Sequence, residues 1–200
     1  MSSKMDVRHL PEFAFEHRMP IWWGTVFFMV IEGSAFLMTF TAYAYLASQN
    51  PDWPLSRVLP NPWIGSVLLA WLLISEVPNM WVKRRIKRCE LNPTRIGMAV
   101  MSLVGLIAVG LRFFEFRYIN VRWDSNAFGS MIWALIFLHT THILVDVAET
   151  LVMTAMSFLS PLTGRRYVDL SENAEYWDFV VLTWVPVYLA IYWIPRWMAQ

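Results

Sequence analysis

Ionisable side chains inside long apolar stretches are the residues of this sequence that could do chemistry. Such a group near the centre of a bilayer costs about 2.5–3.5 kcal/mol on insertion scales, so each needs a reason to be there. Glu32 lies near the middle of the first apolar stretch, among small and hydroxylated residues that allow close helix approach. It is either a proton-handling or channel-linked carboxyl, or a protonated glutamic acid that joins two helices. Its position alone favours neither interpretation.

Two histidines in a later apolar stretch, His139 and His142, are three residues apart and share one helix face. Asp146 and Glu149 follow one and two turns further on and could complete a mixed metal site. A haem held by two histidines needs them on facing helices, and the other two histidines precede the first apolar stretch. We therefore expect no metal site in this chain.

Interhelical hydrogen bonds are the better interpretation of the two histidines, with Glu32 and Glu115 as possible partners. The segment that contains Glu115 and Asp124 also carries three arginines, Arg112, Arg117 and Arg122. These charges predict ion pairs at the membrane surface, each of which contributes little to stability. Asp178 is expected to open the last helix, where a carboxylate suits the positive end of the helix dipole.

The composition shows what kind of element must position these groups. The 200 residues are 57% hydrophobic and only 16% charged, whereas a soluble domain is nearer half apolar and a quarter charged. The net charge of +1 gives no indication of a nucleic-acid partner. The single cysteine excludes both an internal disulfide and a cysteine metal cage.

Five apolar stretches are long enough to cross about 30 Å of hydrocarbon. They cover residues 21–47, 63–82, 95–114, 128–159 and 176–197. Proline-rich segments separate several of them, and tryptophans gather near their ends, where the headgroup layer favours an amphipathic ring. The sequence predicts an all-α integral membrane protein, a bundle of five transmembrane helices. Its parts are a polar N-terminal cytoplasmic segment, residues 1–20, and one membrane domain, residues 21–197.

Basic residues predict the orientation of this bundle. Eleven Lys and Arg residues fall in the N-terminal segment and in the loops after the second and fourth stretches, and five fall on the opposite side. The positive-inside rule therefore places the N-terminus in the cytoplasm and the C-terminus outside. The basic run at 83–88 is either an anchor on anionic lipid or a docking site for a partner.

Four segments in this order resemble subunit III of the haem-copper oxidases, in its short five-helix form. They are the mid-membrane glutamate segment 30–37, the glutamate-aromatic helix end 113–116, the Asp…Gly-Ser…His…His run in 124–142, and the aromatic-rich ending 172–193. The likeness covers roughly residues 21–197.

The sequence also departs from the family pattern. Asp178 stands where the family usually has His, Thr140 and Thr141 replace Gly-Leu, and Asp146 and Glu149 fall where apolar residues are usual. These departures bear on which complex the chain serves more than on its fold.

The resemblance implies a non-redox subunit of a proton-pumping cytochrome c oxidase in aerobic respiration. Such a chain packs mainly against subunit I, with subunit II in the same complex, and the haem and copper lie in the partner subunits. It supports proton uptake and stability, and it binds phospholipid. The electron donor to the assembly would be cytochrome c, or a bc1-type or alternative complex. The expected location is the bacterial inner (plasma) membrane, as a multi-pass protein.

The resemblance also implies roles for single residues. Glu32 is linked to a proton or oxygen route. Family-matching polar positions are Glu115, Asp124, His139, His142 and Glu172. Lipid contacts are implied for Arg165, Arg166 and Trp177, and no catalytic residue or metal ligand is implied in this chain.

Two other functions remain open from the sequence. A related five-helix family accompanies nitric oxide reductases, so an accessory subunit of such an enzyme is the main alternative. An independent transporter or channel is suggested by Glu32, Asp146 and Glu149 within the membrane, but five helices without an inverted repeat argue against it.

Overall fold

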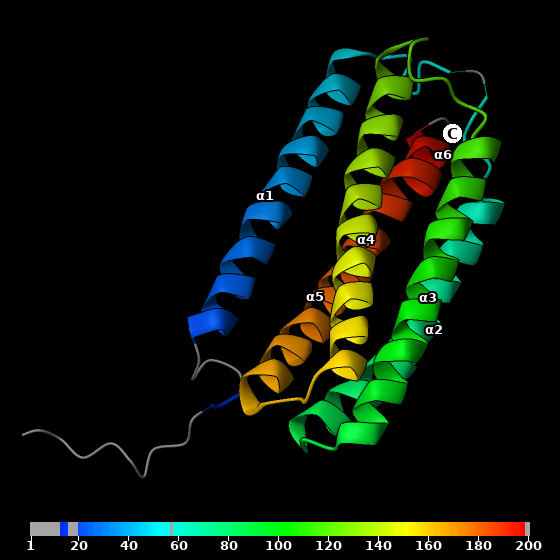
Figure 1. Cartoon of the computed structure of the whole chain (residues 1–200). Helices are drawn as coiled ribbons and strands as arrows, with labels where there is room; N and C mark the ends of the chain where they lie inside the picture. The colour runs from blue at the N-terminus through cyan, green and yellow to red at the C-terminus, as the bar shows by residue number, and fades with distance from the viewer. Residues whose placement is uncertain (1–12, 16–19, 57, 199–200) are drawn as a thin grey trace, which may run out of the picture.

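Five long helices make up almost all of the structure, a computed structural model that describes residues 13–15, 20–56 and 58–198. They are α1 Pro20–Gln49, α2 Pro62–Lys87, α3 Leu91–Tyr118, α4 Ala127–Leu159 and α5 Gly164–Tyr188, and α5 continues through the π-helical turn η2 Leu189–Trp193 into α6 Ile194–Met198 (Figure 1). No strand occurs among the described residues. All five helices, the last counted as Gly164–Met198, are long and apolar enough to span a membrane. The prediction of an all-α, five-helix membrane protein is confirmed.

Local sequence signals start two of these helices. Asn61 caps α2 by accepting a hydrogen bond from the Trp63 backbone N–H, and proline occupies the first helical position, where no N–H is needed. Asn126 caps α4 by accepting a hydrogen bond from the Gly129 N–H at 2.8 Å. A Cβ atom on Gly129 would lie 2.1 Å from the Arg122 carbonyl oxygen, so the loop that precedes α4 requires glycine there.

The predicted start of the last helix is wrong by about one-third of the helix. The other four helices contain the predicted stretches and extend them by at most a few residues, but α5 begins at Gly164 rather than at 176. The segment 164–175 is rich in charge and therefore resembles a loop on hydropathy. Its buried residues Tyr167, Leu170 and Ala174 recur at helical spacing and face the bundle. Asp178 consequently lies in the middle of α5 and not at its N-terminus.

Four of the helices form a ring, and the fifth lies against one side of it. Helix α2 packs on α3 and α5, and α4 packs on the same two helices. Helix α1 contacts α4 and α5 (Figure 1) and buries only Phe36 and Tyr43. Two α3 glycines permit close packing in the ring, Gly97 against Val82 and Gly105 against Val147.

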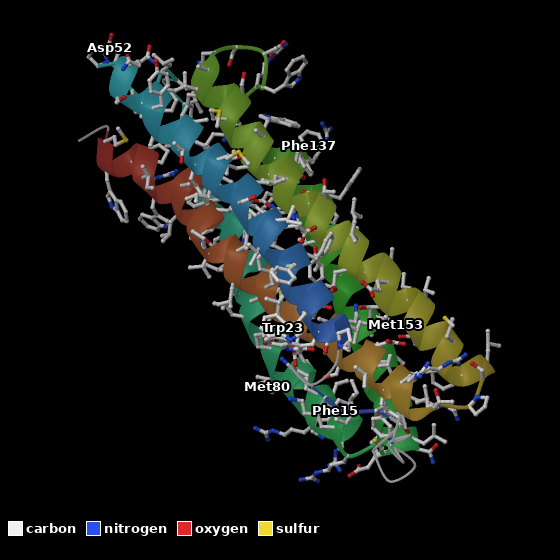
Figure 2. The ribbon with its side chains drawn as sticks, turned by 90° about the vertical axis from the view of Figure 1, so that its left-hand side faces the viewer. Phe15, Trp23, Asp52, Met80, Phe137 and Met153 are labelled. Carbon is white, nitrogen blue, oxygen red and sulfur yellow. The ribbon has the colours of Figure 1, made fainter. Side chains whose placement is uncertain are left out.

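The connections lie at two opposite ends of the bundle. One end holds the start of α1 and the α2–α3 and α4–α5 connections, and the other holds the α1–α2 and α3–α4 connections and the C-terminal helix (Figure 1). Asp52 and Phe15 mark these two ends in Figure 2, in which Phe137 projects outward from α4. The basic residues Lys4, Arg8, Arg18 and Arg57 lie outside the described residues. Which end faces the cytoplasm stays a prediction.

Candidate functional site

Glu32 lies where three helices meet. The Tyr176 hydroxyl of α5 donates a hydrogen bond to Glu32 Oε2 at 2.6 Å, and Nε2 of His142 on α4 lies 3.4 Å from Glu32 Oε1. The Glu32 side chain is 17% exposed and that of His142 is 5% exposed. Phe36, one turn further along α1, packs on the His142 ring with centroids 4.9 Å apart. The structure thus brings together two residues that the sequence proposed as partners.

The hydrogen bond on the far side of the His142 ring determines what this junction can do chemically. His142 Nδ1 lies 2.5 Å from the Leu138 carbonyl oxygen, which can only accept, so Nδ1 carries a proton. The Nε2 atom faces Glu32 Oε1 across 3.4 Å, and no hydrogen bond joins the two atoms.

A second polar group is completely enclosed by the bundle. Arg112 Nη1 donates to Glu115 Oε2 at 2.5 Å, and the Tyr192 hydroxyl donates to Glu115 Oε1. The Arg112 guanidinium also lies over the Trp184 ring, 3.9 Å from its centroid. Both charged side chains are only 2% exposed. The expectation of a surface ion pair is wrong for these two residues, because both occupy the face of α3 that packs into the bundle.

His139 completes this enclosed group in its neutral form. Its Nε2 donates to the Val180 carbonyl oxygen at 2.9 Å, and its Nδ1 accepts from Arg112 Nη2 at 2.7 Å. His139 therefore reaches Glu115 through Arg112 rather than directly. In contrast, Arg122 and Asp124 form the expected exposed pair in the α3–α4 connection, and the hydrogen bond from Arg122 lowers the pKa of the Asp124 carboxyl.

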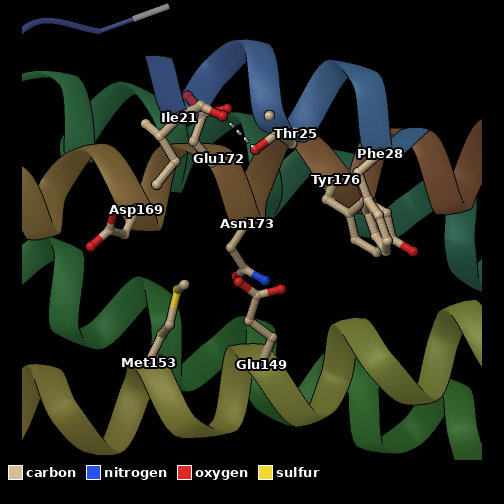
Figure 3. A pocket seen from close by; sticks show the side chains of 10 residues that line it. Ile21, Thr25, Phe28, Glu149, Met153, Asp169, Glu172, Asn173 and Tyr176 are labelled. Atoms are coloured by element: carbon tan, nitrogen blue, oxygen red, sulfur yellow. Dashed lines mark hydrogen bonds between the residues drawn. The ribbon is translucent and has the colours of Figure 1, made fainter. Parts of the chain in front are cut away.

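An acidic cavity of about 390 Å³ opens between α1, α4 and α5 at the end where α1 begins (Figure 3). Its polar lining consists of Thr25, Glu149, Asp169, Glu172, Asn173 and Tyr176. The Thr25 hydroxyl faces the Glu172 carboxylate, which is 5% exposed (Figure 3). Tyr176 joins this cavity to the junction at Glu32.

Sequence reasoning missed most of this cavity because it treated the first part of α5 as a loop. Asp169, Glu172 and Asn173 follow one another at spacings of three and one, which on a helix places them on a common face. Helical periodicity in the segment 164–175 was the signal that could have identified the cavity.

The remaining predicted site residues lie apart from these groups. Arg165 is exposed, and Arg166 donates a hydrogen bond to Ser160 across the α4–α5 connection. Trp177 is buried, and its indole N–H donates to Ser75 Oγ on α2 at 2.9 Å. Asp178 forms an ion pair with Lys83 of α2. Among the described residues, no three His, Cys, Asp or Glu side chains are grouped as metal ligands.

The fold and these polar junctions define a multi-pass α-helical membrane protein. More specifically, the chain belongs to the cytochrome c oxidase subunit III family, whose model matches residues 7–197. It is similar to cytochrome c oxidase subunit 3 of Synechocystis, with 25% identity over 84% of this chain and 73% of the relative. It is 25% identical to the Xenopus laevis subunit 3 over 86% of this chain and 68% of that protein. The subunit 3 of Thermostichus vulcanus is 18% identical over 86% of this chain and 87% of the relative.

These comparisons confirm the resemblance that the four sequence segments indicated. Proteins of this family are subunits of an oxidase complex, so the chain is a multi-pass membrane component of such a complex. They give no support to the nitric oxide reductase alternative.

Proposed function

We propose that this chain is the non-redox subunit III of a proton-translocating haem-copper cytochrome c oxidase, with the haem and copper held by partner subunits. Subunit I is the main contact, and subunit II belongs to the same complex. The observation that carries the proposal is the family match over residues 7–197, which includes all five described helices. The proposed location is the bacterial inner membrane, with residues 1–20 in the cytoplasm and cytochrome c, or a bc1-type or alternative complex, as electron donor to the assembly.

The surface of α1 supports a role in contacting a partner or lipid. Outside its contacts with α4 and α5 it exposes a continuous apolar face. This face includes Phe27, Val30, Ile31, Leu37 and Met38. A second apolar feature lies between α1 and the C-terminal helices, a groove of about 460 Å³ lined by Phe40, Ala47, Ile194 and others. Subunit I and phospholipid acyl chains are the proposed occupants of these surfaces, and Arg165 and Arg166 are proposed to contact headgroups.

The junction at Glu32 supports a role in proton uptake. The acidic cavity next to it lies at the end that the basic residues assign to the cytoplasm, and the His142 ring faces the Glu32 carboxyl at 3.4 Å. If Glu32 acts in this way, Glu32→Gln lowers steady-state oxygen consumption while the complex still assembles. Unchanged consumption in the assembled complex would leave Glu32 with a helix-joining role alone.

Purification of the native complex through an affinity tag on this chain tests the proposed function. We expect mass spectrometry to identify oxidase subunits I and II as companions, together with a haem spectrum and oxygen consumption. Recovery of the chain with nitric oxide reductase subunits, or alone from cells that respire on oxygen, would contradict the proposal.

A further inference from the structure

A buried carboxyl that the proposed function does not use lies at the centre of the helix ring. Asp146 on α4 is 1% exposed, and neither of its carboxylate oxygens has a hydrogen-bond partner among the described residues. An ionised carboxylate without a partner is strongly disfavoured in such surroundings. The side chain therefore requires a proton, a ligand or both.

Asp146 lines a small internal cavity that has the size of one water molecule. The cavity holds about 10 Å³ between α2, α3, α4 and α5, close to the lower limit of about 10–15 Å³ that a buried water needs. Its other polar lining residues are Asn79, Thr150 and Asn173. A buried water typically makes about three hydrogen bonds to groups that would otherwise lack partners.

The two asparagines present such groups. Asn79 Nδ2 donates to the Ala174 carbonyl oxygen at 2.9 Å, and its Oδ1 has no partner. Asn173 Oδ1 accepts from the Thr150 hydroxyl at 2.9 Å, and its Nδ2 has no partner. Two acceptors, the Ala174 carbonyl oxygen and Asp178 Oδ1 at 2.7 Å, fix the orientation of the Asn79 amide. The Asn173 amide is placed with its Oδ1 toward the Thr150 hydroxyl. One free donor and one free acceptor therefore remain on residues that line the cavity beside the two oxygens of Asp146.

We propose that this cavity is a water site at which Asp146 holds an exchangeable proton. The water accepts hydrogen bonds from Asn173 Nδ2 and from the protonated Asp146 carboxyl, and it donates one to Asn79 Oδ1. These three bonds satisfy the amide donor, the amide acceptor and the acid proton together.

The charges around Asp146 agree with a neutral acid. On α4 its neighbours one turn away are His142 and Glu149, and His142 faces Glu32 of α1. From α5 the nearby titratable groups are Tyr176 and Asp178, and the Asp178 carboxylate accepts a hydrogen bond from Asn79 at 2.7 Å. On α2, Lys83 is already paired with Asp178, and α3 contributes Met98 and Met101 to the cavity. Lys83 thus has a carboxylate partner other than Asp146.

Asn173 provides the route by which the proton exchanges. Its side chain lines both the small cavity and the larger acidic cavity. In Figure 3 it points from α5 toward Glu149 on α4, across the larger cavity. The Asn173 side chain therefore separates water in the larger cavity from Asp146, and a proton reaches Asp146 when this side chain moves aside.

Infrared spectroscopy of the purified complex that contains the full chain tests this site. Asp146→Asn removes the carboxyl and keeps its shape. We expect the difference spectrum against the wild type at neutral pH to show the loss of one protonated-carboxyl C=O band, which moves to lower frequency in D₂O. Asn173→Leu should keep the band and slow its shift in D₂O, and the matched control Glu149→Gln should retain the Asp146 band.

Three results would overturn the proposal. One is that Asp146→Asn removes carboxylate bands instead, and another is that Asp146→Asn leaves the C=O region unchanged. The third is a carboxylate band that responds to sodium, which would make the cavity a cation site. If the variant does not assemble, a high-resolution map of the wild-type complex decides. Density for a water that contacts Asn79, Asp146 and Asn173 supports the site, and a dry cavity refutes it.

Discussion

Two arginines of this chain make ion pairs of very different importance. Arg112 and Glu115 are enclosed by the bundle and hold His139 and Tyr192 in one network. Arg122 and Asp124 pair in the exposed α3–α4 connection. Exposed pairs contribute little because water and salt screen them, whereas removal of one buried partner leaves the other charge without compensation.

Removal of the Arg112 side chain should therefore destabilise the protein strongly. We expect Arg112→Met to cost about 3–5 kcal/mol, the usual effect of breaking a buried pair. The change is measured by heating the purified complex and monitoring the temperature at which this chain dissociates from it. Arg122→Met is the matched control and should have the same melting temperature as the wild type. Equal melting of the two variants would show that the enclosed network does not hold the bundle together.

The hydrogen bond between Tyr176 and Glu32 leads us to expect a graded loss of thermal stability in two Glu32 variants. Glutamine at this position can still accept the Tyr176 hydrogen bond, whereas leucine leaves that hydroxyl without a partner, a loss of about 1–3 kcal/mol. The expected order of thermal stability is wild type, Glu32→Gln and then Glu32→Leu. If both variants melt together, the hydrogen bond does not help to fasten α1 to α5.

The location of some of these residues inside the bundle could be predicted from the sequence, because they lie within apolar stretches. Glu32 and His142 each lie within an apolar stretch, so both had to find a partner inside the protein, and they face each other. Arg112 and Glu115 were misplaced because helix ends usually carry exposed charges, and only the packing of α3 reveals which face is enclosed. Asp146 stood out as a buried acid, but its cavity depends on amides from two other helices.

Close helix packing in the ring depends on glycine at particular positions of α3. A Cβ atom at Gly105 would lie 2.6 Å from Val147 Cγ2 of α4, whereas one at Gly110 would meet nothing within 4 Å. The same helix therefore offers a test position and its control.

Gly105→Ala should push α3 and α4 apart. Overpacking of this kind costs about 1–3 kcal/mol, while Gly110→Ala should be neutral or slightly stabilising. Thermal unfolding of the two variants measures the difference. A Gly105→Ala protein as stable as Gly110→Ala would show that α3 and α4 do not approach as closely as described.

Helix α5 shows where prediction from hydropathy ends. Four helices are apolar over most of their length and were placed within a few residues. The first part of α5 carries Arg165, Asp169, Glu172 and Glu175, so its mean hydropathy is low. It is helical because its apolar residues still line up on one face, and the acidic cavity lies beside it.

The orientation of the molecule can be tested with its single cysteine. Cys89 is exposed in the α2–α3 connection, at the end predicted to face the cytoplasm. A membrane-impermeant maleimide should label it in inverted vesicles and not in intact spheroplasts. Partial burial raises the pKa of the Cys89 thiol, so less thiolate is present at a given pH and labelling should accelerate as pH rises. Labelling in intact spheroplasts, absent from a Cys89→Ser control, would reverse the proposed orientation.

The molecule as a whole is a small helical bundle. Much of its apolar surface is not covered by other parts of the same chain, which suits a subunit of a larger membrane complex. Its enclosed polar groups join helices, and we propose that the redox chemistry belongs to partner subunits. Selective removal of this chain from the purified oxidase tests that division of labour most directly. We expect the remaining complex to keep its haem and copper, to lose activity faster during turnover, and to recover when the chain is added back. Loss of haem or copper with the chain, or turnover that does not change without it, would contradict the account.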